Sequence, residues 1–320
     1  MLFLAVNYHY IHPEGLYPFS GIYPTPVEKF INQLEELGRH FDFISQNDLI
    51  CAIDKKKSLP ERCCLLTFDD GLKSQYENAL PILKKKKIPA VFFVNSLPYK
   101  EKKACLVHKI HFLRANLPPQ DFLERIDYNL KLYSGKKLKD LYPQSKGASR
   151  QYRYDTPEIA KLKFILNYLL PPKYREKIIN KIFYQFVKSE ADFCQMFYMS
   201  EKELIELSKL SFLGIHSAAH QSLSQLSEKE LRNDLTENLK TIRKVVGGKG
   251  IEGISYPYGG PNDILPEIYR ICQPLGLKYG FTMRRDFNRT LKNPFLLARM
   301  DTNDVLGGKY PLKIFKKFYV

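Results

Sequence analysis

The stretch "LLTFDDG", residues 65–71, runs from an apolar segment directly into two adjacent carboxylates, Asp69 and Asp70, and then a glycine. Adjacent like charges repel, and the end of a strand near a core is an unfavourable place for them. A parallel strand over 63–68 would end at Asp69, and α/β proteins place ligands and catalytic groups at the carboxyl ends of such strands. A divalent cation would relieve the repulsion, which would leave the second carboxylate free to act as a base.

Short apolar segments alternate with amphipathic ones along most of the 320 residues, a pattern typical of a parallel α/β sheet or barrel. Capping boxes mark two helix starts, at Ser200 with Glu203 and at Ser227 with Glu230. The predicted strands are 2–7, 41–45, 63–68, 90–94, 212–215, 253–256, 279–283 and 295–299, and the predicted helices between them include 26–37, 76–87 and 228–245.

The alternation stops over residues 98–199, which predict several helices rich in Lys, Tyr and Leu, such as 156–170 and 173–188. Residues 134–156 are polar and basic and predict an irregular segment. We therefore predict a helical insertion over 98–199 in a barrel domain formed by residues 1–97 and 200–320.

The net charge of +16 predicts attraction to polyanions such as nucleic acid, anionic lipid headgroups or phosphate-bearing substrates, although a lysine-rich surface can also serve solubility alone. Aromatic and basic residues alternate in "SRQYRYD" (149–155), which fits a stacking surface for nucleic acid. No nucleic-acid-binding motif accompanies this segment, so we expect no specific nucleic-acid partner. The basic insertion could instead contact a membrane surface or a partner protein.

The N-terminal stretch "MLFLAVNYHYIHPEG" (1–15) has no basic region, and its apolar run is too short for a secretion signal. The six cysteines show no CxxC spacing, which disfavours both a disulfide framework and a cysteine zinc site. These features predict a cytoplasmic protein.

A second chemical motif lies in "FLGIHSAAH" (212–220), where His216 and His220 follow an apolar strand. On one helical turn, residues four apart face the same way. Two histidines and one carboxylate, with an open position, are the ligand set of a catalytic zinc site. A third element, "YPYGG" (256–260), is a turn after a short strand that can present a backbone N–H to a bound oxygen.

The motifs "TFDDG" (67–71), "HSAAH" (216–220) and "YPYGG" (256–260) resemble, in kind and order, those of the polysaccharide deacetylases, the NodB-homology domain of carbohydrate esterase family 4. The resemblance covers most of the chain outside 98–199. It implies an α/β fold, a distorted (β/α)₇ barrel of the NodB type, here with a large helical insertion.

The resemblance also implies roles for individual residues. Asp69 would be the general base, and Asp70, His216 and His220 would hold a divalent metal, with Zn²⁺ expected. A backbone N–H near Tyr258 would help to hold the oxyanion of the reaction.

Two departures from the family pattern lead to two further candidates. Many members carry an arginine before the Pro-Tyr of the third motif, where this chain has Ser255, and Arg299 in "LLARMD" is the candidate replacement. Many members also have a late histidine as general acid, but no histidine follows His220 here. In circularly permuted members an N-terminal Tyr-His motif supplies the acid, and "NYHYI" is similar to it. His9 is therefore the predicted general acid, with His12 as the less favoured neighbour.

The reaction implied is hydrolysis of an amide, an N-acetyl group on an amino-sugar. The predicted location makes a cytoplasmic glycan or surface-polysaccharide precursor the expected substrate, free or linked to a nucleotide or a lipid. An N-formyl group would need the same chemistry. A barrel that has lost catalysis and only binds glycans is the alternative, which the missing motif arginine favours and the intact Asp-Asp-His-His set opposes.

Overall fold

The apolar segments predicted as strands pair in parallel into one curved sheet. In this computed structural model, which describes residues 1–15, 22–141, 155–248 and 250–318, the sheet order is β10-β1-β5-β6-β7-β8-β9, and β4 also pairs with β5. The strands are β1 (Leu2–Tyr8), β4 (Asp42–Phe43), β5 (Arg62–Phe68), β6 (Ala90–Val94), β7 (Leu213–Ile215), β8 (Gly253–Ser255), β9 (Tyr279–Phe281) and β10 (Met300–Asp301). The predicted α/β class is confirmed.

The two ends of this sheet approach each other through one segment near the C-terminus. Leu297 pairs with Phe281 of β9, and three residues later Met300 pairs with Val6 of β1. Residues 297–301 therefore lie between the first and last strands of the sheet and curl it toward a closed barrel. This matches the predicted distorted barrel.

Alternate side chains of the strands point into the curve of the sheet, as the period of two requires. This inner cluster is apolar and includes Phe3, Ala5, Cys63, Leu65, Val91, Phe93, Tyr279, Phe281 and Leu297. Two strands contribute glycine to it: a Cβ on Gly214 or Gly253 would lie 2.3 Å from the ring of Phe93 or Tyr279. The absence of a side chain at these two positions is what makes room for the two rings.

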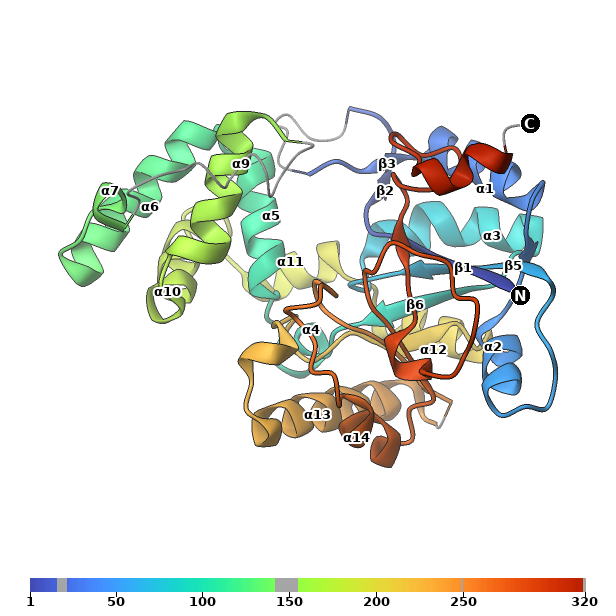
Figure 1. Cartoon of the computed structure of the whole chain (residues 1–320). Coiled ribbons are helices and arrows are strands. Elements are labelled where there is room, and N and C mark those ends of the chain that lie inside the picture. Colours follow the sequence, from blue (N-terminus) through green and yellow to red (C-terminus); the bar gives the residue numbers. More distant parts are fainter. Residues whose placement is uncertain (16–21, 142–154, 249, 319–320) are drawn as a thin grey trace. The chain divides into compact units, whose positions relative to one another are not determined.

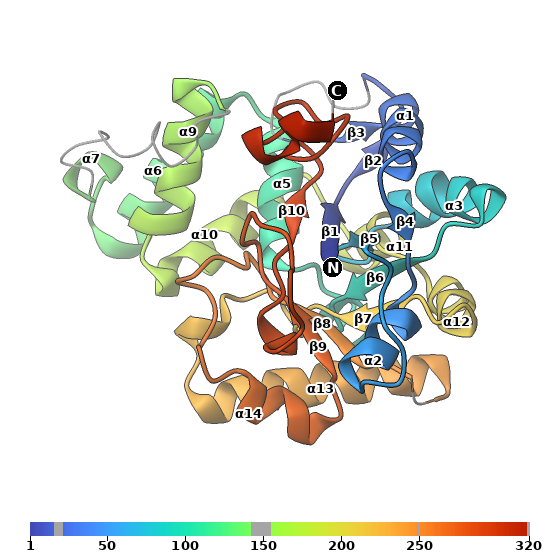
Figure 2. The same cartoon turned by 45° about the vertical axis from the view of Figure 1, so that its right-hand side comes forward.

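The opposite set of alternate residues, including Leu4, Val6, Cys64, Leu66 and Phe92, packs against helices. Helices α1, α3, α12 and α13 lie outside the strands in both views (Figure 1, Figure 2). The helices of this part are α1 (Val27–Gly38), α2 (Gln46–Ile53), α3 (Leu80–Lys86), α4 (Leu97–Lys100), α12 (Glu201–Lys209), α13 (Glu228–Val246) and α14 (Tyr269–Cys272).

The capping boxes predicted at two helix starts are confirmed. Ser200 begins α12 with Glu203 as its partner, and Ser227 begins α13 with Glu230. In each box the serine hydroxyl accepts the N–H of the glutamate while the glutamate accepts the N–H of the serine, so two otherwise unpaired donors are satisfied.

The chain divides into two compact units. Unit 1 comprises Met1–Glu14, Pro24–Lys103 and Cys194–Val320, and unit 2 comprises Gly15–Tyr23 and Ala104–Phe193. Of the predicted insertion 98–199, the first six and last six residues thus belong to unit 1.

Unit 2 is helical, as its sequence predicts. Its helices are α5 (Leu106–Asn116), α6 (Pro119–Ser134), α7 (Leu138–Leu141), α9 (Pro157–Phe164) and α10 (Pro172–Phe183), and α11 (Glu190–Phe197) ends in unit 1. Within this unit Lys109 is buried and forms an ion pair with Glu190 at 2.7 Å. Residues 142–154, most of the segment predicted to be irregular, lie outside the described residues.

Three predicted elements differ from the structure. The predicted helix 156–170 ends as a π-helix, Ile165–Leu169, after α9. The predicted strand 295–299 is a 3₁₀ turn, Pro294–Leu296, followed by an isolated pairing at Leu297, because Pro294 has no N–H to give to a ladder and favours a helical start. The predicted helix 76–87 begins as a π-helix, Gln75–Ala79, before it continues as α3. Among the described residues, no helix combines the length and the apolar character needed to cross a membrane.

Candidate active site

The inner face of the curved sheet changes from apolar to polar at the carboxyl ends of its strands. Asn7, Thr67 and Ser255 occupy the next inner positions of β1, β5 and β8, and Asp69 and His216 continue the same alternation just beyond β5 and β7. All five are buried. Because the strands are parallel, these side chains meet at one edge of the sheet, as the position of the two aspartates predicts.

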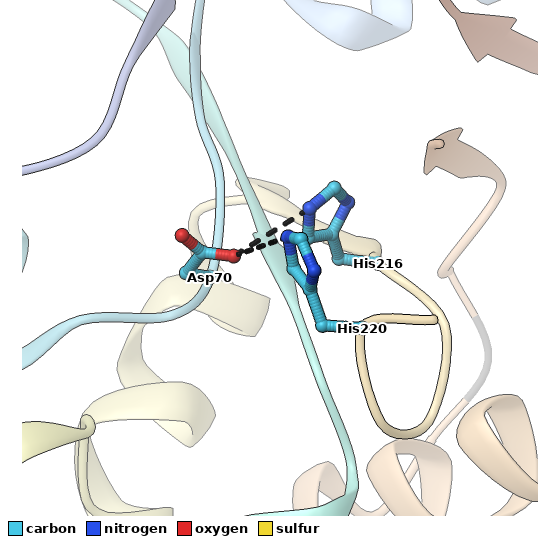
Figure 3. A group of neighbouring side chains, drawn as sticks. All are labelled: Asp70, His216 and His220. Carbon is cyan, nitrogen blue, oxygen red and sulfur yellow. Dashed lines mark ion pairs between the residues drawn. The ribbon is translucent and has the colours of Figure 1, made fainter. Parts of the chain in front are cut away.

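Asp70, His216 and His220 converge at this edge. Asp70 Oδ1 lies 3.5 Å from His216 Nε2 and 3.4 Å from His220 Nε2, and one ligand atom of each residue lies within 4.8 Å of the other two. Figure 3 shows both imidazoles pointing at the same carboxylate oxygen. Two ligands of a tetrahedral zinc ion, each at about 2.0–2.1 Å, are about 3.3–3.4 Å apart. The separations therefore fit a divalent ion of this size.

The hydrogen bond of the second ring nitrogen of His216 also fits a cation at this position. His216 Nδ1 donates to the carbonyl oxygen of Ser255 at 2.7 Å, and burial lowers the pKa of the imidazole, so the ring is neutral with its lone pair on Nε2. That lone pair faces an Asp70 oxygen, which is also an acceptor. Metal-binding histidines commonly orient themselves through such a second hydrogen bond, and a cation between the two acceptors would turn their repulsion into attraction.

The backbone of the two segments that carry the candidate ligands is unusual, and it corrects one prediction. His216 and His220 do not lie on a helical turn: residues 216–220 form an irregular loop after β7, with φ of +59° at Ser217 and +57° at His220. Asp70 also has a positive φ, +81°. Residues other than glycine rarely adopt this region, and such strain is concentrated at functional sites. The two imidazoles converge because of this loop conformation.

Asp69 is held by Arg299. Arg299 Nη1 donates to Asp69 Oδ1 at 2.8 Å and Nη2 donates to Oδ2 at 2.7 Å, while Asn7 Nδ2 donates to Oδ2 at 3.1 Å. Burial by itself would raise the pKa of Asp69, but the charge and the hydrogen bonds of Arg299 lower it to about 2. The carboxylate is therefore ionised at neutral pH and fixed in orientation.

Arg299 itself is fully buried and reaches the site from the segment just before β10. Its Nη2 also donates to Ser255 Oγ at 2.7 Å, and its Nη1 donates to Thr67 Oγ1 at 3.2 Å. Ser255, the residue at the position of the family's arginine, thus contacts the arginine that we predicted as its replacement. The geometry is what the prediction requires, and the catalytic role of Arg299 stays a prediction.

His9 follows β1 at the same edge, half-buried and close enough to Asp69 to interact with it electrostatically. Gln75, at the start of the π-helix, donates to the backbone carbonyl oxygens of His9 at 2.9 Å and of Asp69 at 2.5 Å, which fixes the ends of β1 and β5. His12 differs: burial lowers its pKa to about 4, so at neutral pH its ring is neutral and lacks the acidic second proton of an imidazolium. This argues against His12 as the acid.

Tyr258 lies in a tight turn beside the ligands. Its φ is +61°, the N–H of Gly259 donates back to the carbonyl of Pro257 at 2.7 Å, and its ring lies 5.0 Å from that of His220. The side chain is 47% exposed. The structure thus places the turn of the third motif next to the first two.

Sequence reasoning missed several residues that shape this site. Asn7 could have been found, because it occupies an inner position of β1 two residues before His9. Nothing in the sequence marks Gln75 as part of the site, and nothing marks the polar residues of α13 that contact the His216–His220 loop.

A family model described as polysaccharide deacetylase matches residues 56–113 and 207–279. Over these residues the chain is similar to the polysaccharide deacetylases. The matched ranges contain Asp69, Asp70, His216, His220 and Tyr258, whereas His9 and Arg299 lie outside them. The two latter candidates therefore depend on the geometry described above.

This chain resembles known deacetylases along most of its length. It is 23% identical over 312 residues to the poly-beta-1,6-N-acetyl-D-glucosamine N-deacetylase of Staphylococcus aureus, an alignment that covers 94% of this chain and 79% of that protein. Among solved structures, the Streptococcus pyogenes deacetylase PplD in complex with acetate has a TM-score of 0.54 at 14% identity, covering 94% of this chain and 92% of that one. IcaB from Ammonifex degensii has a TM-score of 0.53 at 19% identity, covering 93% and 91%. These structures share the fold.

Proposed function

We propose that this chain is a metal-dependent hydrolase that removes an N-acetyl group from an amino-sugar residue of a glycan. The observation that carries the proposal is the convergence of Asp70, His216 and His220 on one point beside an ionised, oriented Asp69. A divalent ion bound by the three ligands would supply Lewis acidity, which makes an acyl carbonyl more electrophilic and a water more acidic.

Asp69 would take the proton of the attacking water. Its Oδ2 lies 4.0 Å from His216 Nε2, so the carboxylate is next to the proposed ligands without being one of the cluster. Arg299 and Asn7 keep it ionised and stop it from turning. A base of this kind contributes through position more than through intrinsic basicity, because its pKa is low.

His9 would protonate the departing amine. The amine of an amide is a poor leaving group until it receives a proton, and His9 stands at the same edge of the sheet as the base. A backbone N–H of the turn at Tyr258 would stabilise the negative charge on the acyl oxygen. Zn²⁺ is the proposed ion, because two imidazoles and one carboxylate are a ligand set that zinc prefers.

For the substrate, the name of the Staphylococcus aureus relative supports an N-acetylglucosamine unit. We keep the cytoplasmic location as part of the proposal, which makes a nucleotide-linked or lipid-linked precursor the expected form of that unit. The net charge of +16 suits a phosphate-bearing substrate. Contact of the basic insertion with a membrane or partner also stays a proposal, and residues 149–154 of the segment weighed for nucleic acid lie outside the described residues.

Two alternatives stay open to experiment. An N-formyl group would fit the same chemistry. A barrel that only binds glycans is less consistent with the site, because a binding protein has no need for a buried carboxylate paired with a buried arginine next to three metal ligands.

The decisive experiment is mass spectrometry of acylated sugars incubated with the Zn²⁺-loaded chain, with the Asp69→Asn variant as control. The substrates are N-acetylated and N-formylated forms of a nucleotide-linked glucosamine and of a β-1,6-linked glucosamine oligomer. A loss of the acetyl mass with the active chain alone supports the proposal. Loss of only the formyl mass supports the deformylase, and binding without any mass change supports the glycan-binding barrel.

A further inference from the structure

The loop 216–220 carries both proposed histidine ligands, yet the loop itself has no regular secondary structure. Ser217 and His220 both adopt positive φ, a conformation that side chains other than glycine rarely take. Such a conformation persists only where the surroundings over-determine it. The partners of the loop's backbone groups therefore decide where the two imidazoles lie.

Asp234 of α13 binds the middle of this loop. The N–H of Ala218 donates to both carboxylate oxygens, at 3.0 Å and 3.1 Å, and the N–H of Ala219 donates to the same carboxylate. These two amides lie between the two ligands in the sequence. A carboxylate is suited to this task because it only accepts hydrogen bonds.

Asn238 lies one helical turn further along α13 and is fully buried. Its Nδ2 donates to the carbonyl oxygen of Ser217 and, at 3.3 Å, to that of Val94 at the end of β6. Asp234 and Asn238 face the same side of the helix because they are four residues apart. One therefore accepts from the loop and the other donates to it.

Several other backbone groups of the loop have partners as well. Asn95 Nδ2 donates to the carbonyl oxygens of His216 and, at 3.1 Å, of Ser217. The N–H of Leu97 donates to the carbonyl of Ala218 at 2.9 Å, and the N–H of His220 donates to Ser217 Oγ at 3.0 Å. Of these contacts, those of α13 are the ones in which side chains of a single helix bind both N–H and C=O groups of the loop.

We propose that Asp234 and Asn238, the α13 pair, are positioning residues of the metal site: they hold the loop 216–220 in the strained conformation in which both imidazoles point at Asp70. The inference rests on the proposed function. Neither residue is a member of the cluster of possible ligands. Their effect on a bound ion is exerted through the backbone between the two histidines.

The test is metal affinity, measured with Co²⁺ and Zn²⁺ by competition against a chromophoric chelator, on the full chain and on two variants. Asp234→Asn keeps one acceptor but turns an amide NH₂ toward one of the loop N–H groups. Asn238→Leu keeps the volume and removes the donor. We expect each to weaken metal binding about 10- to 100-fold, as loss of such supporting residues commonly does, and to change the absorption spectrum of bound Co²⁺.

Two matched controls separate positioning from general stability. Asp48→Asn alters another carboxylate that accepts a backbone N–H, in the capping box of α2. Asn129→Leu removes another buried asparagine, whose Nδ2 donates to the carbonyl of Arg125 in unit 2. Both should lower the melting temperature of the metal-free protein and leave the metal affinity and the Co²⁺ spectrum unchanged.

The outcomes are distinguishable. Wild-type affinity and an unchanged Co²⁺ spectrum in folded Asp234→Asn would overturn this inference and leave the proposed function standing. Failure of the wild-type chain to bind either ion would overturn the proposed function and this inference with it. If Asn238→Leu does not fold, Asp234→Asn decides the question, because it preserves the size of the side chain and part of its hydrogen bonding.

Discussion

Arg299 and Asp69 form a bidentate ion pair inside the barrel, although 230 residues separate them in the chain. Both side chains are buried, and the two N–O distances are 2.8 Å and 2.7 Å. A bidentate guanidinium fixes both the charge and the plane of a carboxylate. The consequence for a general base is that its lone pairs point in a set direction before any substrate arrives.

Replacing Asp69 with Asn should abolish the base and spare the ligands. We expect the rate of deacetylation to fall about 10²- to 10⁴-fold, while zinc content, measured by elemental analysis of the purified protein, stays near one ion per chain. The amide keeps the size of the side chain but removes the counter-charge of the buried Arg299, so urea denaturation of the variant is measured beside its rate. Full activity in this variant would show that the base lies elsewhere.

His220→Ala should lose metal as well as activity, because it removes one of the three proposed ligands. Elemental analysis after dialysis, together with chelator competition, measures the change. His40→Ala is the matched control, since His40 lies beside Glu36 and outside the cluster. Unchanged metal content in His220→Ala would remove this residue from the ligand set.

Arg299→Leu should lower both the stability of the fold and the rate of the reaction. Removing one partner of a buried ion pair leaves the other charge uncompensated, at a cost of about 3–5 kcal/mol in the free energy of unfolding. Urea denaturation measures this cost. Arg299→Lys should recover only part of it, because an ammonium group cannot bind both carboxylate oxygens in the same way. A lysine variant with wild-type stability and activity would show that the bidentate hydrogen bonding is not important.

His9→Gln should slow the hydrolysis of amides far more than that of activated esters. An N-acetyl sugar needs a proton on its leaving amine, whereas a nitrophenyl acetate does not. We expect the amide rate to fall about 10²- to 10⁴-fold, the ester rate to change little, and metal content to be unaffected. An equal loss on both substrates would contradict the role of proton donor, and the same pattern in His12→Gln would transfer it to that residue.

His12 predicts a pH dependence of stability. Its folded-state pKa of about 4 lies below the ordinary value of 6.5. Between pH 6.5 and pH 4 the imidazole is therefore protonated in the unfolded chain and neutral in the folded chain. The stabilisation is complete above pH 6.5 and is lost as the pH falls toward 4. Relative to His12→Gln, the wild type should lose about 1–3 kcal/mol of unfolding free energy over that window, a range that allows for partial exposure. A constant difference from pH 7.5 to 4, measured by urea denaturation, would contradict the burial of this imidazole.

The sequence by itself determined the parallel α/β pattern and the position of the proposed metal ligands at one edge of the sheet. Both are local: a side-chain period of two marks a buried strand, and the residues that follow a parallel strand reach its carboxyl edge in any such sheet. Asp69 with Asp70, and His216 after β7, could therefore be placed without coordinates. The helical turn predicted for His216 and His220 was wrong because a spacing of four does not reveal positive φ at Ser217 and His220.

Only the tertiary structure decided what surrounds those ligands. The pairing of Arg299 with Asp69 depends on the curvature that carries residues 297–301 between β9 and β1, and curvature is a property of the whole sheet. Asp234 and Asn238 lie on an ordinary amphipathic helix. Their contacts with the loop 216–220 exist because α13 packs beside Ser217 and Ala218. A periodic pattern fixes which face of an element is buried. Which distant residue meets that face depends on how all the elements pack together.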